Sequence, residues 1–122
     1  MIKNFLIINC IGQDDKLGLK INKDFFIHNF SDKKNKNNSL VSEILNFIKA
    51  HKVKLNDKFS VIVNQGPGSF SGIRVSLAVA KGLKISKNVQ LYGYKDTDLK
   101  HFDKENIEKL LNTNLLEKNL IK

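Results

Sequence analysis

The sequence predicts an α/β domain built on a mixed sheet of five strands, and three observations predict it. Apolar or alternating segments fill the first thirty residues and are separated only by short turn clusters. Two segments with helical periodicity follow, and each precedes another β-rich run. Strands joined by short turns are antiparallel, whereas strands joined through a helix are parallel. The predicted sheet is therefore mixed, with helices packed against it.

The first three predicted strands cover residues 5–10, 17–21 and 25–30. The first is continuously apolar, as expected of a buried central strand, and the second alternates. Turn clusters at 13–15 and 22–24 separate them and imply two antiparallel hairpins. The polar residues 31–38 predict a mobile loop.

Helices are predicted at 39–52 and 73–83, and they alternate with strands at 59–64 and 89–94. A further helix is predicted after Asp103, which can cap it, with Ile107, Leu110 and Leu111 on one face. Residues 112–114 are expected to end this helix. We divide the chain into a lobe at 1–102 and a helical tail at 103–122.

Length and composition bound the possible classes of protein. The chain has 122 residues and a hydrophobic fraction of 41%, which suffices for one folded domain and argues against global disorder. Its one cysteine, Cys10, excludes an internal disulfide, and we expect it to be a buried small side chain. The apolar run after Lys3 is too short for a signal peptide or a membrane span. We therefore expect a cytoplasmic protein without membrane contacts.

The net charge of +9 raises the possibility of nucleic-acid binding. However, Arg74 is the only arginine, whereas readers of phosphates and base edges usually depend on arginine. The lysines are spread along the chain apart from a small group at 33–36. We favour a solvated lysine surface and keep a basic, tRNA-contacting module as an alternative.

A glycine-rich corner between the strand at 59–64 and the following helix is the most distinctive motif. The residues of this motif are Gly66, Pro67, Gly68, Ser69, Phe70, Ser71, Gly72 and Arg74. Glycines allow a tight turn there, and the two serines are candidate helix caps. Neither the Walker pattern nor the dinucleotide pattern matches. We favour a structural corner and keep a nucleotide- or anion-binding lobe as an alternative.

The helix at 73–83 is apolar on nearly every side, and only Arg74 and Lys81 form a polar strip. One sheet can cover only one side of such a helix. Small residues at 78 and 82 would let another helix approach closely. We therefore favour a protein-binding surface over complete internal burial.

The stretch 65–83, which reads QGPGSFSGIRVSLAVAKGL, resembles the signature of the TsaB (YeaZ) family. The strand order before it and Tyr92-Gly93-Tyr94 after it also agree, so the resemblance covers about 4–102. It implies one lobe of the actin/Hsp70-like (ribonuclease H-like) fold, with the second lobe largely missing. It further implies a non-catalytic partner in the synthesis of threonylcarbamoyladenosine (t6A) in tRNA.

Further expectations about partners follow from this resemblance. The chain would bind and support a TsaD-like catalytic subunit, joined by a TsaE-like ATPase, and would contact tRNA mainly through that complex. Without its partner it would form a homodimer. The residues predicted to form the partner interface are Leu40, Ile44, Ile48, Val75, Ala78, Val79 and Gly82.

No catalytic, cofactor-binding or metal-binding residues are predicted. The family usually has Asp-Thr-Ser where this chain has Asn9-Cys10-Ile11, so an acidic group is missing from the usual phosphate or metal corner. The three histidines, at 28, 51 and 101, lack helical metal-ligand spacing. The serines of the corner have no evident base, and the acidic pairs at 14–15 and 96–98 are better explained as turn residues.

Overall fold

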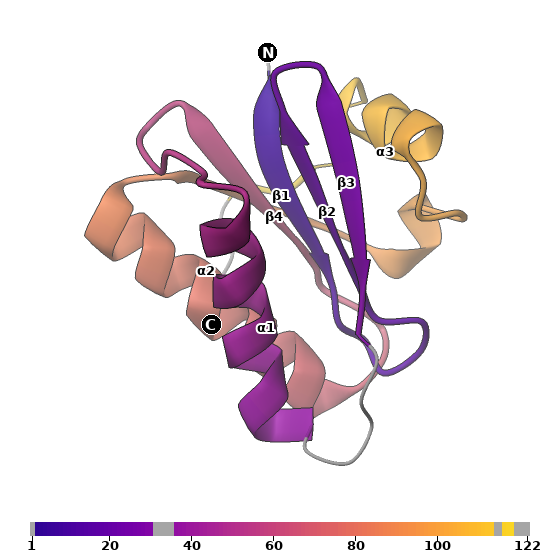
Figure 1. The fold of residues 1–122 in the computed structure, drawn as a ribbon. Helices are drawn as coiled ribbons and strands as arrows, with labels where there is room; N and C mark the ends of the chain where they lie inside the picture. Colours follow the sequence, from indigo (N-terminus) through magenta and orange to yellow (C-terminus); the bar gives the residue numbers. More distant parts are fainter. Residues whose placement is uncertain (1, 31–35, 114–115, 119–122) are drawn as a thin grey trace.

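The computed structural model describes residues 2–30, 36–113 and 116–118, and within them five strands form one mixed sheet (Figure 1). The strands are β1 (Asn4–Asn9), β2 (Lys16–Ile21), β3 (Asp24–Asn29), β4 (Phe59–Asn64) and β5 (Gln90–Tyr94), in the order β3-β2-β1-β4-β5. β1 pairs antiparallel with β2, and β2 pairs antiparallel with β3. β4 runs parallel to both β1 and β5. The mixed sheet and both hairpins confirm the sequence prediction.

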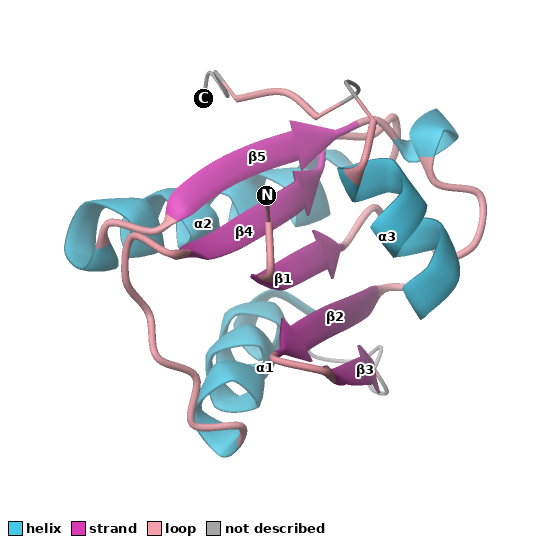
Figure 2. Cartoon of the chain, turned by 90° about the horizontal axis from the view of Figure 1, so that it is seen from above, coloured by secondary structure: helices cyan, strands magenta, loops and turns pink. Residues whose placement is uncertain are grey.

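Three α-helices cover the two faces of this sheet (Figure 2). α1 (Lys36–Ala50) and α2 (Phe70–Lys87) lie on one face, and α3 (Lys104–Leu111) lies on the other. A short 3₁₀ helix, η1 (Asp96–Asp98), connects β5 toward α3. None of the helices in the described ranges is both long enough and apolar enough to cross a membrane.

The alternation of side chains along β1 supplies both halves of the core. Leu6 and Ile8 point to the α1/α2 face, where they join a cluster that includes Ile44 and Ala80. Phe5 and Ile7 point to the other face and pack in a second cluster with residues of α3. Because both faces of β1 are covered, the strand reads as one continuous apolar run.

The first helix begins earlier than predicted. α1 starts at Lys36, so part of the expected 31–38 loop is helical, while residues 31–35 lie outside the described part of the chain. The helix ends at Ala50 rather than at 52 because Lys52 adopts a positive φ of 51°, which a right-handed helix cannot contain. The first turn of α1 consists of polar residues, so apolar periodicity does not mark where the helix begins.

The second helix is longer than predicted at both ends. α2 includes Phe70, Ser71 and Gly72, which the sequence analysis placed in the corner. Ser69 is the N-cap, and its Oγ accepts a hydrogen bond from the Gly72 N–H at 3.3 Å. The helix ends where Asn88 takes a left-handed conformation, with φ 64°.

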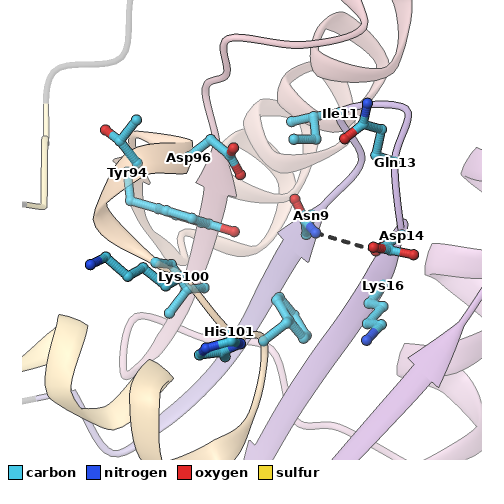
Figure 3. Close-up of a pocket in the computed structure, with 12 residues that line it drawn as sticks. Asn9, Ile11, Gln13, Asp14, Lys16, Tyr94, Asp96, Lys100 and His101 are labelled. Carbon is cyan, nitrogen blue, oxygen red and sulfur yellow. Dashed lines mark hydrogen bonds between the residues drawn. The ribbon is translucent and has the colours of Figure 1, made fainter.

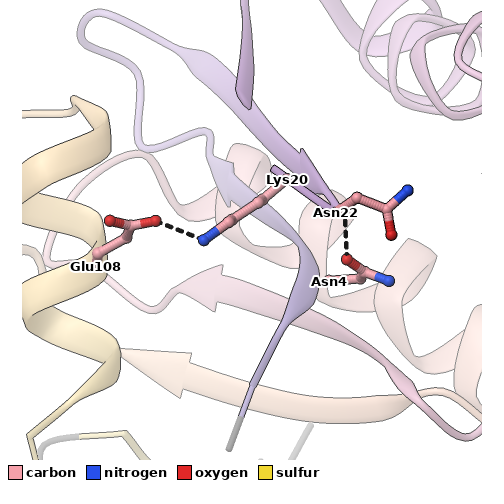
Figure 4. Close-up of polar contacts among 4 residues, drawn as sticks. All are labelled: Asn4, Lys20, Asn22 and Glu108. Atoms are coloured by element: carbon pink, nitrogen blue, oxygen red, sulfur yellow. Dashed lines mark hydrogen bonds and ion pairs between the residues drawn. The ribbon is translucent and has the colours of Figure 1, made fainter. Parts of the chain in front are cut away.

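α3 follows the predicted pattern. Asp103 caps it by accepting a hydrogen bond from the Asn106 N–H at 2.8 Å, and Ile107 and Leu110 are buried. A 2.7 Å ion pair between Lys20 and Glu108 joins the helix to β2, and the pKa of the Glu108 carboxyl is lowered by this hydrogen bond (Figure 4). The division between 1–102 and 103–122 remains a prediction.

The cap of α3 predicts a specific pH dependence. The N–H and side-chain amide of Asn106 lower the pKa of Asp103 below its usual value of 3.8. The stabilisation from this cap is therefore complete above that pH and is lost as the pH falls through the lower, folded-state pKa. We expect Asp103→Ala to be less stable than wild type at pH 7, and the gap to shrink below about pH 4.

Urea unfolding between pH 7 and pH 2.5 checks this prediction. Asp103→Asn is the matched control, because asparagine keeps an oxygen acceptor but does not titrate. A gap between wild type and Asp103→Ala that stayed constant over the whole range would contradict the assigned cap.

Candidate functional site

The glycine-rich corner connects β4 to α2 and packs against residues 10–12, which follow β1. Gly66 has a φ of 94°, and the Gly66–Pro67 peptide bond is cis. A Cβ atom at Gly68 would lie 2.5 Å from the Cβ of Ile11, and one at Gly72 would overlap the carbonyl oxygen of Cys10. Gly68 and Gly72 are thus required because the corner and residues 10–12 approach each other too closely for a side chain.

Four N–H groups of this corner donate hydrogen bonds within the chain. Ser69 N–H donates to the Ile11 carbonyl at 2.6 Å, and Ile73 N–H donates to the Ser69 carbonyl at 3.1 Å. Gly72 N–H bonds the Ser69 hydroxyl, and Gly66 N–H bonds the Asn64 side chain at 2.8 Å. An anion held at this corner would have to compete for these four donors.

Two buried asparagine side chains, Asn9 and Asn64, hold the corner in place, and Figure 3 shows Asn9 with its hydrogen bond to Asp14. Asn64 donates from Nδ2 to Asn9 Oδ1 at 2.7 Å and to Asp96 Oδ1 at 3.1 Å. Asn9 in turn donates to the Asp14 carbonyl at 3.4 Å. The oxygen and the nitrogen of each side-chain amide therefore have hydrogen-bond partners. Through these bonds the two asparagines join β1, β4, η1 and the corner.

A hollow of about 650 Å³ opens beside these asparagines, at the carboxyl ends of the parallel strands. Figure 3 shows Lys16, Lys100 and His101 around it, with the ring of Tyr94 directed inward. Tyr94 is buried, and its hydroxyl makes no hydrogen bond within the described residues. Burial raises the pKa of this hydroxyl far above its usual value of 10, so it stays protonated.

The nucleophile candidates have structural partners. Cys10 is buried, and desolvation raises the pKa of its thiol to about 12, which suits a small core side chain and not a nucleophile. Among the described hydrogen bonds, the hydroxyls of Ser69 and Ser71 contact each other, Ser69 also accepts from the Gly72 N–H, and neither contacts a base.

The titratable pairs considered from the sequence also have structural partners. His28 Nε2 lies at hydrogen-bond distance, 2.7 Å, from Glu43 Oε1, and His51 packs against the rings of Phe26 and Phe47. Asp15 accepts a hydrogen bond from the Gly12 N–H in the first turn. Within the described ranges, no three His, Cys, Asp or Glu side chains are grouped so that they could hold a metal ion.

The structure separates the predicted interface residues into two groups. Leu40, Ile44 and Ile48 are buried in the core cluster between α1 and the sheet, so their side chains are covered by this chain itself. On α2, Ala78 and Gly82 are exposed, and a Cβ atom at Gly82 would meet nothing within 4 Å.

The remaining two interface residues, Val75 and Val79, are half-buried against the same cluster. On α1 the exposed large apolar side chains are instead those of Val41 and Leu45, which are 37% and 44% exposed. Helical periodicity predicts a helix in this segment, but by itself it does not reveal which apolar residues the sheet covers and which it leaves exposed.

This arrangement, a mixed five-stranded sheet with helices on both faces and a strand-to-helix glycine corner, defines a single actin-like lobe. Structures with this fold confirm the class. A structure of YeaZ from Pseudomonas aeruginosa superposes with a TM-score of 0.67 and 16% identity, covering 80% of this chain and 46% of that one. A second structure, described as an uncharacterized protein with similarity to peptidase YEAZ from Pseudomonas aeruginosa, superposes with a TM-score of 0.67 over 80% of this chain and 45% of its own.

Sequence comparison identifies the family. The model of the family described as TsaD, tRNA N6-adenosine threonylcarbamoyltransferase, matches residues 31–103. The tRNA threonylcarbamoyladenosine biosynthesis protein TsaB of Buchnera aphidicola subsp. Baizongia pistaciae (strain Bp) is 40% identical over 50 residues, which is 41% of this chain and 23% of that protein. The chain belongs to the family that this model describes, and it is similar to the proteins named TsaB and YeaZ. It spans less than half the length of the relatives that it matches.

Proposed function

We propose that this chain is a non-catalytic partner in the synthesis of threonylcarbamoyladenosine in tRNA, acting in the cytoplasm by binding a TsaD-like catalytic subunit. The name of its TsaB relative supports the pathway. The partner role is supported by one structural observation, the exposure of apolar residues on both α1 and α2. Exposed Ala78 and Gly82 leave room on α2 for a helix of another chain.

The glycine corner acts in this proposal as a positioning element. Its internal hydrogen bonds fix the first turn of α2 against residues 10–12 and thereby set the direction in which Ala78 and Gly82 face. The partner's helices would pack on this surface together with exposed Val41 and Leu45 of α1. A TsaE-like ATPase would complete the assembly, and two copies of this chain would pair through the same surface when the catalytic subunit is absent.

A single substitution tests the surface. We expect Ala78→Arg to abolish binding to the catalytic subunit, because a charged side chain would then be desolvated at a close helix–helix contact. The fold should remain intact, because residue 78 is exposed. Affinity capture with the purified catalytic subunit measures the loss, and thermal unfolding verifies folding.

Asn112→Arg is the matched control, because Asn112 is exposed at the end of α3, on the opposite face of the sheet. It should bind like the wild type. Unchanged binding by a folded Ala78→Arg variant would reject the assigned surface, and equal losses in both variants would point to a nonspecific effect of charge.

A further inference from the structure

The fold gathers lysines that are far apart in the sequence at one end of the molecule, which we call the amino edge. The parallel strands begin there, because Asn4 pairs with Phe59 and Ser60 pairs with Gln90. The β2–β3 turn lies at the same end, where the Asn22 N–H bonds Asn4 Oδ1 at 2.8 Å (Figure 4). Figure 1 shows the C-terminal ends of α1 and α2 toward this end as well, at its upper side.

Eight exposed lysines belong to these strand starts, turns and helix ends. They are Lys3, Lys23, Lys49, Lys52, Lys54, Lys58, Lys84 and Lys87. None of them forms an ion pair with another described residue. The same segments carry only two carboxylates, Asp24 and Asp57. The amino edge thus has an excess of six positive charges, out of a formal net charge of +9 for the chain.

Helix capping explains only a small part of this excess. The C-terminal ends of α1 and α2 each carry a partial charge equivalent to about −0.5, so together they offset about one positive charge. At the opposite end of the strands, the four acids Asp14, Asp15, Asp96 and Asp98 are balanced by four basic residues, at positions 16, 74, 95 and 100. The charge is therefore concentrated on one side of the fold.

A hollow of about 390 Å³ lies within the amino edge. Lys3 and Lys58 line it together with Asp57, Asn4, Gln90 and Tyr92, so two lysines and one carboxylate are among the lining residues. Tyr92 is half-buried and lines this hollow, and an aromatic side chain at such a site can stack on a nucleic-acid base. A concave site with an aromatic ring, amide groups and flanking lysines suits a nucleotide chain better than the flat plane of a lipid headgroup layer.

We propose that the amino edge binds the phosphate backbone of RNA. The inference deepens the proposed function and rests on it for the choice of tRNA as the RNA. It assigns this chain a direct contact with the substrate, in addition to contacts made by a catalytic partner. About six lysine–phosphate contacts would give a slope of log K against log salt of about −4 to −5.

Fluorescence anisotropy with a labelled, unmodified tRNA tests the proposal, using the full chain between 50 and 200 mM salt. The triple variant Lys54→Glu, Lys58→Glu and Lys87→Glu reverses three charges of the amino edge. Its matched control is Lys95→Glu, Lys100→Glu and Lys104→Glu, which has the same net charge but changes exposed residues elsewhere. We expect the edge variant to lose at least roughly tenfold in affinity and the control variant no more than about threefold.

Equal losses in the two variants, or no salt-dependent tRNA binding by the wild type, would overturn the proposal. So would binding to anionic phosphatidylserine vesicles in the absence of tRNA binding, because that result would assign the edge to a membrane surface. Capture by the catalytic subunit provides an independent readout. Normal capture of the edge variant by the catalytic subunit would show that the partner surface is intact. The tRNA affinity of that variant then tests the amino edge independently of the proposed partner function.

Discussion

Replacing Gly72 by alanine is expected to destabilise the chain by about 3 kcal/mol, a value at the upper end of overpacking costs. The added methyl group would overlap the carbonyl oxygen of Cys10, which belongs to the backbone and cannot rotate away. This overlap can be removed only if the first turn of α2 moves away from residues 10–12. In a domain of this size the change lowers the melting temperature by about 10 °C.

Gly82→Ala is the matched control, because it makes the same change in the same helix. A Cβ atom at position 82 would meet nothing within 4 Å, so alanine should stabilise α2 by about 0.5–1 kcal/mol. Thermal and urea unfolding of both variants measure the difference. Similar stabilities for the two variants would contradict the close packing of the corner.

Asn64→Leu is expected to cost about 2–4 kcal/mol of unfolding free energy, because it leaves buried polar groups without partners. Asn64 donates to Asn9 and Asp96 and accepts from the Gly66 N–H, so one substitution removes three hydrogen bonds. It should also weaken capture by the catalytic subunit, because the corner that positions α2 loses its support.

Asn46→Leu makes the same chemical change on the exposed surface of α1, where its effect should stay within about 0.5 kcal/mol. Urea unfolding monitored by circular dichroism compares the two variants. If Asn64→Leu were as stable as Asn46→Leu, the buried asparagine pair would have no role in holding the corner.

The order and pairing of the strands were predictable because they depend on local patterns. The continuous apolar run of β1 and the short turns on either side of β2 determine a central strand and two hairpins. The bounds of β4 were predicted correctly for the same reason. Helix ends were less predictable, because α1 begins and α2 ends in polar residues that apolar periodicity does not mark.

The candidate site was predictable only in part. The corner motif indicated close backbone approach, which Gly68 and Gly72 display. The side of α1 that faces the sheet depends on tertiary packing, so Leu40, Ile44 and Ile48 were assigned to the partner interface although they are buried in this chain. The clustering of lysines at the amino edge depends on the sheet topology and has no signal in any single segment.

The central claim is that this chain binds the catalytic subunit of its own organism, and co-purification of the two tests it most directly. Both chains would be co-expressed, with a tag on the catalytic subunit alone, and light scattering would give the stoichiometry. We predict a stable one-to-one complex that survives gel filtration. Recovery of the catalytic subunit alone, while this chain is folded and monodisperse in the same lysate, would contradict the partner function.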